Sequence, residues 1–145
     1  MTEKESRNVI REKSCGAVIF CTENGRTRYL IEHMRQGHYA LCKGHMEAGE
    51  TERETAEREI LEETGLNVQV DTAFRETLEY SPYHGCIKEV VYFIARAGDT
   101  DTVPQPEEVG EIVWAEAEEA QRLLTFDNDR GIFQNAVRFI EKTAG

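Results

Sequence analysis

The chain has 145 residues, of which 39% are hydrophobic and 31% charged, and its formal net charge at pH 7 is −11. This length and composition are typical of a globular protein, and we expect a single domain over residues 1–145. The negative charge argues against nonspecific binding to DNA or RNA, because such binding needs a basic surface to neutralise phosphates.

The N-terminus and the cysteines bear on where the protein works. Residues 1–12 are predicted to form a short polar arm, without the apolar run of a signal peptide. No segment approaches the ~18 consecutive apolar residues that span a bilayer, so we expect no membrane association. The cysteines are scattered, at Cys15, Cys21, Cys42 and Cys86. Reduced thiols and a cytoplasmic location are therefore expected. The sequence does not indicate an oligomeric state.

Apolar runs and turn signals predict the first elements. Residues 14–21 are mostly apolar, which is typical of a strand covered on both faces. The Asn24-Gly25 pair predicts a hairpin turn that leads into a second strand at 28–34. Residues 35–50 contain three glycines and no regular period, which favours a loop.

A helix follows this loop, and local signals place its ends. Thr51, with Glu54 three residues later, is a capping-box pattern. Gly65 is a natural stop, because glycine tolerates the left-handed conformation that ends many helices. The stripe expected to be buried consists of Ala56 and Ile60, with Leu61 to one side.

The rest of the chain alternates strands and loops and ends in helices. We predict strands at 67–79, 86–95 and 109–114, a surface loop at 97–108, and helices at 116–124 and 128–142. The strand at 86–95 should be central. The last helix should pack on the sheet through Ile132, Phe133, Ala136, Phe139 and Ile140. This order predicts an α/β fold with a mixed sheet between helices.

Three carboxylates share one face of the first helix: Glu59, Glu62 and Glu63. Like charges at this spacing repel, so the arrangement costs stability unless a cation lies among them. A divalent cation with oxygen ligands would remove the conflict, and Mg²⁺ is the usual hard cation in phosphate chemistry. For the helix alone, a solvated acidic face in a glutamate-rich protein is the preferred interpretation.

The loop and the helix together fit the Nudix box, which reads Gly, five residues, Glu, seven residues, Arg-Glu, an aliphatic, any residue, Glu-Glu, any residue, Gly, an aliphatic. The matching residues are Gly44, Glu50, Arg58, Glu59, Ile60, Glu62, Glu63, Gly65 and Leu66. Such a match arises by chance with odds on the order of one in 10⁵ or fewer. The chain therefore resembles a Nudix hydrolase, and the resemblance implies a Nudix-type α/β/α sandwich with a mixed β-sheet.

The resemblance also implies a site for metal-dependent hydrolysis of phosphoanhydrides. Mg²⁺ is the implied cofactor, with Mn²⁺ as a substitute. The implied metal ligands are Glu59, Glu62, Glu63 and the backbone carbonyl of Lys43. Arg58 would pair with Glu50 and orient the carboxylates, a supporting role that suits a planar cation among acids.

A further acid is expected from outside the box, just before Trp114. The segment offers Glu107, Glu108 and Glu111, of which Glu108 is favoured and Glu107 is the second choice. The alternative is that these are surface acids on a loop. Glu59 and Glu108 are both candidates for the general base.

The flanks of the box are similar to the animal and archaeal type of diadenosine tetraphosphate hydrolase. The likeness rests on KGHxExGE at 43–50, FRETLEY at 74–80 and the segments EVVYFIA and EEVGEIVWAEAEEA. It implies that Tyr80 stacks on a base and that Lys43, His45 and Lys88 contact the polyphosphate. The simpler alternatives are a packed strand tyrosine and a solvated edge lysine.

The chain departs from that subfamily just ahead of KGH. Where the subfamily usually has a tryptophan and prolines, this sequence has Tyr39, Ala40, Leu41 and Cys42. Tyr39 is a candidate to stack on a base in place of that tryptophan, in addition to Tyr80. The leading hypothesis is asymmetric cleavage of diadenosine tetraphosphate to ATP and AMP. The alternatives are an RNA 5′-pyrophosphohydrolase, a nucleoside triphosphate pyrophosphatase, or a nucleotide-binding module without catalysis.

Overall fold

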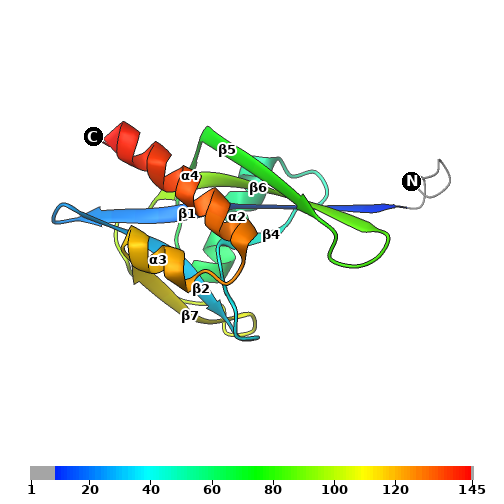
Figure 1. Cartoon of the computed structure of the whole chain (residues 1–145), viewed down its shortest axis with the longest axis horizontal. Coiled ribbons are helices and arrows are strands. Elements are labelled where there is room, and N and C mark those ends of the chain that lie inside the picture. The colour runs from blue at the N-terminus through cyan, green and yellow to red at the C-terminus, as the bar shows by residue number, and fades with distance from the viewer. Residues whose placement is uncertain (1–8, 145) are drawn as a thin grey trace.

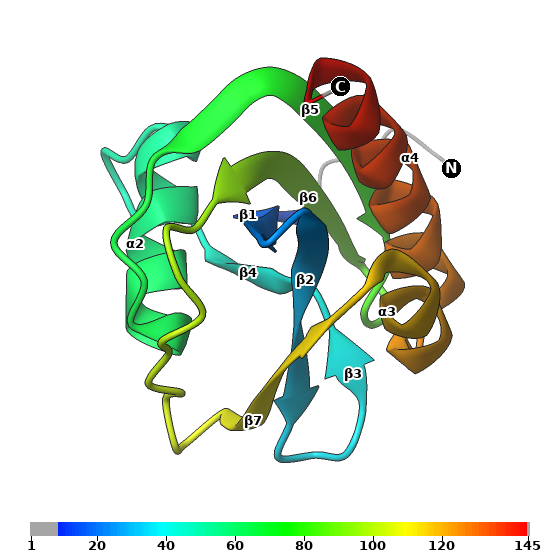
Figure 2. The ribbon, with the colours of Figure 1, turned by 90° about the vertical axis from the view of Figure 1, so that its left-hand side faces the viewer.

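The computed structural model describes residues 9–144, in which a mixed sheet lies between helices on both faces (Figure 2). The strands are β1 (Ile10–Glu23), β2 (Arg26–Met34), β3 (Tyr39–Ala40), β4 (Cys42–His45), β5 (Val70–Tyr80), β6 (Cys86–Arg96) and β7 (Val109–Ala115). The helices are α2 (Glu52–Thr64), α3 (Ala117–Leu123) and α4 (Asp127–Ala144). Helix α2 covers one face, and α3 and α4 cover the other, so the expected α/β/α sandwich is confirmed.

The long strand β1 organises the sheet (Figure 1). The strand order is β3-β2-β1-β6-β5, with β4 also paired to β1 and β7 to β2. The β1–β6 pair is parallel and the other pairs are antiparallel. The central position predicted for the strand at 86–95 is confirmed, because β6 lies between β1 and β5.

Alternate residues of β1 pack into the two halves of the hydrophobic core, one on each face of the sheet. Cys15, Ala17 and Ile19 belong to the hydrophobic cluster under α2, whereas Val18 and Phe20 belong to the cluster under α3 and α4. Successive side chains of a strand point to opposite faces, so a strand between two helix layers must be apolar on both. The prediction for residues 14–21 is confirmed, since every one of them is buried.

The β1–β2 hairpin turns at the predicted pair. Asn24 has φ 53° and Gly25 has φ 77°. Two consecutive left-handed residues match the twist of the flanking strands, and asparagine and glycine adopt this conformation at the lowest cost. Glu23 and Arg26 are Cα partners, so the turn has two residues.

Three boundary predictions were wrong. Residues 10–12 belong to β1 and not to the predicted arm, whose residues 1–8 lie outside the described part. The predicted loop at 35–50 contains β3 and β4. Strand β4 lies so close to β1 that a Cβ on Gly16 would collide with the carbonyl of Cys42. This long-range pairing, and not local periodicity, makes residues 42–45 a strand. Strand β5 begins at Val70 and not at residue 67.

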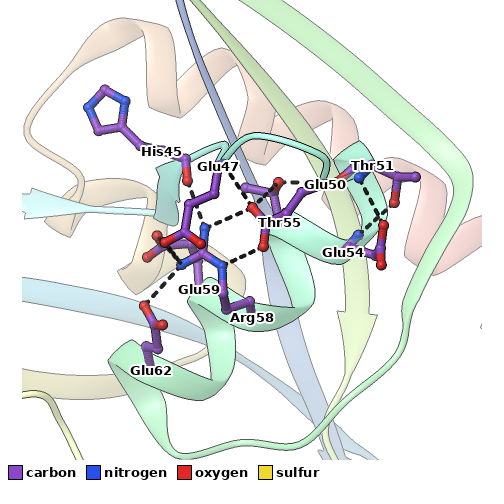
Figure 3. Close-up of polar contacts among 9 residues, drawn as sticks. All are labelled: His45, Glu47, Glu50, Thr51, Glu54, Thr55, Arg58, Glu59 and Glu62. Atoms are coloured by element: carbon purple, nitrogen blue, oxygen red, sulfur yellow. Dashed lines mark hydrogen bonds and ion pairs between the residues drawn. The ribbon is translucent and has the colours of Figure 1, made fainter.

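Helix α2 begins and ends where its sequence signals place it. Thr51 Oγ1 accepts a hydrogen bond from the Glu54 amide (3.1 Å), and Glu54 Oε1 accepts one from the Thr51 amide (2.9 Å) (Figure 3). Gly65 ends the helix at φ 77°. The prediction for Leu61 was wrong, because its side chain is 49% exposed. The buried residues of α2 are Thr55, Ala56, Ile60, Glu63 and Thr64.

Helix α4 packs on the opposite face as predicted. Ile132, Phe133, Ala136 and Ile140 are buried, and Phe139 packs against the same cluster. The Phe133 ring meets the edge of Tyr29 with centroids 5.1 Å apart. Within residues 9–144, none of the helices is long and apolar enough to cross a membrane.

Candidate active site

A cavity of about 410 Å³ brings together most of the side chains that the sequence singled out. It lies where β4, α2, β6 and the loop before β7 meet. Six of the predicted residues line it: Lys43, His45, Glu59, Glu63, Lys88 and Glu108. The box helix, the strand before it and two distant segments therefore converge on one space.

Arg58 is the centre of a hydrogen-bond network at the start of α2 (Figure 3). Its guanidinium donates two hydrogen bonds to the Glu50 carboxylate, at 2.6 and 3.0 Å. It also donates to Glu59 at 3.0 Å, to Glu62 at 3.1 Å and to the His45 carbonyl at 2.8 Å. A planar group with five donors can hold several acceptors at fixed angles, which an ammonium cannot. The expected pairing of Arg58 with Glu50 is present.

The network fixes the ionisation of Glu50 and Arg58. Hydrogen bonds from Arg58 lower the pKa of Glu50 to about 2. The same contact with Glu50 raises the pKa of Arg58 further above its ordinary value. Glu50 therefore stays ionised at any physiological pH. The Arg58–Glu50 pair ties the glycine-rich loop to the helix that carries Glu59.

Gly44 lets Glu59 lie directly against strand β4. A Cβ on Gly44 would overlap the carboxylate of Glu59. Gly44 does not have a positive φ, so the glycine is needed here for space and not for backbone conformation. Glu59 is held between this strand and the guanidinium of Arg58, which restricts where its oxygens can point.

Glu63 lies deeper than the other carboxylates of the helix face. It is 2% exposed, and its Oε2 atom accepts a hydrogen bond from the Cys42 thiol at 3.8 Å. Burial, with the carboxylates of Glu32 and Glu59 nearby, raises its pKa. Burial also raises the pKa of Glu32, to about 7. Arg58, the nearest cation of the network, hydrogen-bonds to Glu59 but not to Glu63.

This donor set fits a hard divalent cation. Glu59 and Glu63 face the same cavity, and burying several carboxylates without a cation costs free energy. A cation among them would offset that cost, and carboxylate and carbonyl oxygens are the ligands that Mg²⁺ and Mn²⁺ prefer.

Two lysines supply positive charge to the cavity. Lys43 and Lys88 both line it. Burial and the nearby Lys43 ammonium lower the pKa of Lys88. Two ammonium groups held this close repel each other, so an anion between them would be favourable. Lys88 is the Cα partner of Tyr80 in the β5–β6 pair. The lysine that lines the cavity therefore lies beside the predicted base-stacking residue.

The loop before β7 brings acids to the cavity. Glu107 and Glu108 both line it. The Glu108 carbonyl accepts a hydrogen bond from the Arg35 amide at 2.9 Å, which fastens this loop to the end of β2. Glu111 lies on β7 as the Cα partner of His33 and does not line the cavity.

A second cavity, of about 340 Å³, has mostly apolar walls and includes Tyr80. Leu78, Val90, Tyr92 and Phe126 also line it. It shares His38, Ala40 and Lys43 with the first cavity. A charged cavity and an apolar, aromatic one therefore have a common wall.

Three of the predicted residues line neither cavity: Arg58, Glu62 and Tyr39. Glu62 is 52% exposed and is held by Arg58 on the outer side of α2. Tyr39 stacks on His33, with ring centroids 4.1 Å apart and planes 2° from parallel. His45 lines the first cavity, and its imidazole points away from the Arg58 network (Figure 3).

Sequence reasoning missed three residues of these walls: Glu32, His38 and Asp129. Glu32 could have been found, because it lies two positions after Leu30 and hence on the same apolar face of β2. An acid on a covered face is a signal of function or of a special partner. His38 and Asp129 gave no such signal, since one lies in a turn and the other in the first turn of α4.

Comparisons with known proteins agree with this geometry. A NUDIX domain model matches residues 12–136. The asymmetrical bis(5′-nucleosyl)-tetraphosphatase of Sus scrofa is 29% identical over 140 residues, which cover 88% of this chain and 95% of the relative. The crystal structure of a C. elegans Ap4A hydrolase binary complex is similar with a TM-score of 0.81 and 25% identity, over 90% of this chain and 98% of that one. An 8-oxo-(d)GTP phosphatase of Mycolicibacterium smegmatis is 29% identical over 94% of this chain and 44% of the relative.

Proposed function

The chain belongs to the NUDIX domain family, and on that premise we propose that it cleaves diadenosine tetraphosphate asymmetrically to ATP and AMP. The family model and the tetraphosphatase relatives make it a Nudix phosphoanhydride hydrolase. One observation supports this substrate most strongly. A cavity with carboxylates and lysines shares a wall with an apolar, aromatic cavity, as a polyphosphate attached to a nucleobase requires.

The metal in this proposal is Mg²⁺, with Mn²⁺ as a substitute. Glu59, Glu62, Glu63 and the Lys43 carbonyl would hold it, and Glu108 would add a carboxylate from the loop before β7. When bound, such ions neutralise polyphosphate charge and lower the pKa of water. The half-exposed Glu62 would have to turn away from Arg58 to take part.

The remaining roles belong to side chains of the cavity walls. Lys43 and Lys88 bind the polyphosphate, and their positive charge stabilises the negative charge that spreads over it during cleavage. Arg58 positions Glu59 by a direct hydrogen bond and is itself held by Glu50. Glu59 and Glu108 both line the cavity and are the two candidates to accept the proton of the attacking water.

Tyr80 binds the base in the second cavity. Stacking of a base on an aromatic ring contributes about 1–3 kcal/mol. Phe126 offers a second aromatic surface in the same cavity, and the buried Asp129 carboxylate provides an acceptor at its edge. Tyr39 remains a predicted stacking residue, which would have to leave His33 to reach a base.

A second candidate is hydrolysis of a modified nucleoside triphosphate. The similarity to the M. smegmatis 8-oxo-(d)GTP phosphatase favours it. That reaction needs one base site, as does one half of a dinucleoside polyphosphate. The two proposals therefore share the metal-binding and phosphate-binding residues and differ in substrate length.

The cellular location is proposed from the thiols. Cys15, Cys21, Cys42 and Cys86 are all free and buried. Free thiols fit a reducing compartment, and we propose the cytoplasm.

A substrate panel tests the proposal. Diadenosine tetraphosphate, 8-oxo-dGTP, unmodified nucleoside triphosphates and 5′-triphosphorylated RNA would each be incubated with the protein and Mg²⁺ or Mn²⁺, and products resolved by chromatography. Equal amounts of ATP and AMP, with the highest kcat/KM for diadenosine tetraphosphate, would support it. A higher kcat/KM for 8-oxo-dGTP or RNA ends would refute it.

A matched pair of variants tests the base site. Tyr80→Ala should raise KM for diadenosine tetraphosphate about 10-fold, because one stacking contact is lost. Tyr80→Phe keeps the ring and should leave KM close to that of the wild type. Equal KM values for both variants and the wild type would show that the base binds elsewhere.

A further inference from the structure

Beside the proposed magnesium site lies a buried group of ligands that contains sulfur. Glu32 on β2, Cys42 on β4 and Glu63 on α2 each place one ligand atom within 4.8 Å of the other two. The three side chains are 1%, 1% and 2% exposed, respectively. They come from three separate elements, so the fold and not local sequence creates the group.

The backbone holds these ligands in place. Glu32 is the Cα partner of Ala40 in the β2–β3 pair, and Cys42 is the partner of Ala17 in the β4–β1 pair. Glu63 lies on the buried side of α2, which packs on β4. Rigid elements position metal ligands more precisely than loops do.

Among the described residues, Glu32 and Glu63 lack the cationic partners that buried carboxylates need. Within residues 9–144, neither Glu32 nor Glu63 forms an ion pair with a lysine, arginine or histidine. The Oε2 atom of Glu32 is buried and has no hydrogen-bond partner there. A buried carboxylate oxygen without a partner costs free energy that a cation would offset.

The sulfur atom decides which cation fits. Thiolate ligands favour borderline or soft ions, whereas Mg²⁺ requires near-octahedral oxygen coordination. Zn²⁺ is bound by cysteine and carboxylate ligands and commonly has three protein ligands and one open position. Glu32 and Glu63 both line the 410 Å³ cavity, so an open position would face it. We propose that Glu32, Cys42 and Glu63 form a buried binding site for Zn²⁺.

The two metal sites would compete, because Glu63 belongs to both. Zn²⁺ on the deeper ligands removes a carboxylate from the magnesium site. Zn²⁺ therefore inhibits Mg²⁺-dependent hydrolysis, a consequence that rests on the proposed function. The binding of Zn²⁺ itself does not rest on it.

Cobalt absorption tests the site without any activity measurement. The full chain, stripped of metal with a chelator, would be titrated with Co²⁺. A thiolate ligand gives Co²⁺ an intense charge-transfer band in the near ultraviolet. We expect the band at one Co²⁺ per chain, its loss on adding Zn²⁺, and its absence in Cys42→Ser. Absence of the band in the wild type, or the same band in Cys42→Ser, would overturn the proposal.

Cys15→Ser is the matched control. Cys15 is a buried thiol of the same hydrophobic cluster as Cys42 but does not belong to the ligand group. It should keep the cobalt band, and loss of the band there would also contradict the assignment. If Cys42→Ser fails to fold, Glu32→Gln replaces it. Weakening of Zn²⁺ binding by about 10- to 100-fold supports the site, and unchanged affinity refutes it.

Inhibition connects the site to function. With Mg²⁺ present, inhibition is measured relative to the rate of each protein without Zn²⁺, and Cys42→Ser should need about 10-fold or more additional Zn²⁺ for half inhibition. Equal sensitivity of the variant and the wild type would show that Zn²⁺ inhibits at other ligands. If the chain hydrolyses no nucleotide, the proposed function fails, whereas the cobalt band still decides the zinc site.

Discussion

Replacing Gly44 with alanine tests how Glu59 is positioned. The new Cβ would occupy the space now filled by the Glu59 carboxylate. Normal van der Waals contact begins near 3.4 Å, so the carboxylate or strand β4 must retreat by more than about 1 Å. Misplacing a catalytic group by about 1 Å can lower the rate about 100-fold. We therefore expect kcat to fall about 100-fold in Gly44→Ala.

The assay compares rate and stability in the same variant. Initial rates at saturating Mg²⁺ give kcat, and thermal unfolding followed by circular dichroism shows whether the fold survives. Gly98→Ala is the control, because Gly98 has no neighbour within 4 Å of the added Cβ and no positive φ. A folded Gly44→Ala protein with the kcat of the wild type would refute the role given to this close contact.

Three further predictions concern other parts of the chain. Arg58→Lys keeps the charge but loses the two-point contact with Glu50. We therefore expect kcat and the apparent Mg²⁺ affinity each to fall about 10- to 100-fold. An Mg²⁺ titration identical to that of the wild type would contradict the positioning role. Gly131 lies at an exposed position inside α4 with open space around it. Gly131→Ala should therefore stabilise the protein by about 1 kcal/mol and raise Tm by about 3 °C. A lower Tm in calorimetry would contradict this expectation. The hydrogen bond from Arg75, with Lys13 nearby, lowers the pKa of Glu52 from 4.5 to about 2. The stabilisation from Glu52 is therefore complete above pH 4.5 and is lost as the pH falls toward 2. Urea unfolding of wild type and Glu52→Gln should show a stability gap that closes over this range, and a gap independent of pH would exclude the linkage.

Local sequence signals predicted the elements that are defined by interactions between neighbouring residues. The capping box of Thr51 and the left-handed Gly65 place both ends of α2 correctly. The Asn24-Gly25 pair likewise locates the hairpin. In each case the interactions that define the element lie within a few residues of one another, so the sequence alone contains them.

Elements made by distant contacts were not predictable in this way. Strand β4 exists because β1 pairs with it, and its four residues have no periodic pattern. Leu61 lies beside the buried stripe of the helical wheel, yet the sheet does not reach it, whereas Glu63 is buried by strands that the helix sequence does not contain.

The motif and its flanks singled out residues that the fold brings close together. Glu59, Glu63 and Lys43 meet in one cavity with Glu108, as the box and its flanks implied. Glu32 lay outside every motif, and only the sheet brings it to Glu63. Three-dimensional proximity of residues from β2, β4 and α2 carries information that no spacing rule provides.

The most direct measurement follows the products of diadenosine tetraphosphate with wild type and Glu63→Gln in saturating Mg²⁺. Glutamine keeps the shape of the side chain and removes the charge that would hold the cation. The wild type should release ATP and AMP in equal amounts, and Glu63→Gln should lose activity by about 100-fold or more while remaining folded. Release of ADP as the sole product, or an undiminished rate in Glu63→Gln, would contradict the proposed active site.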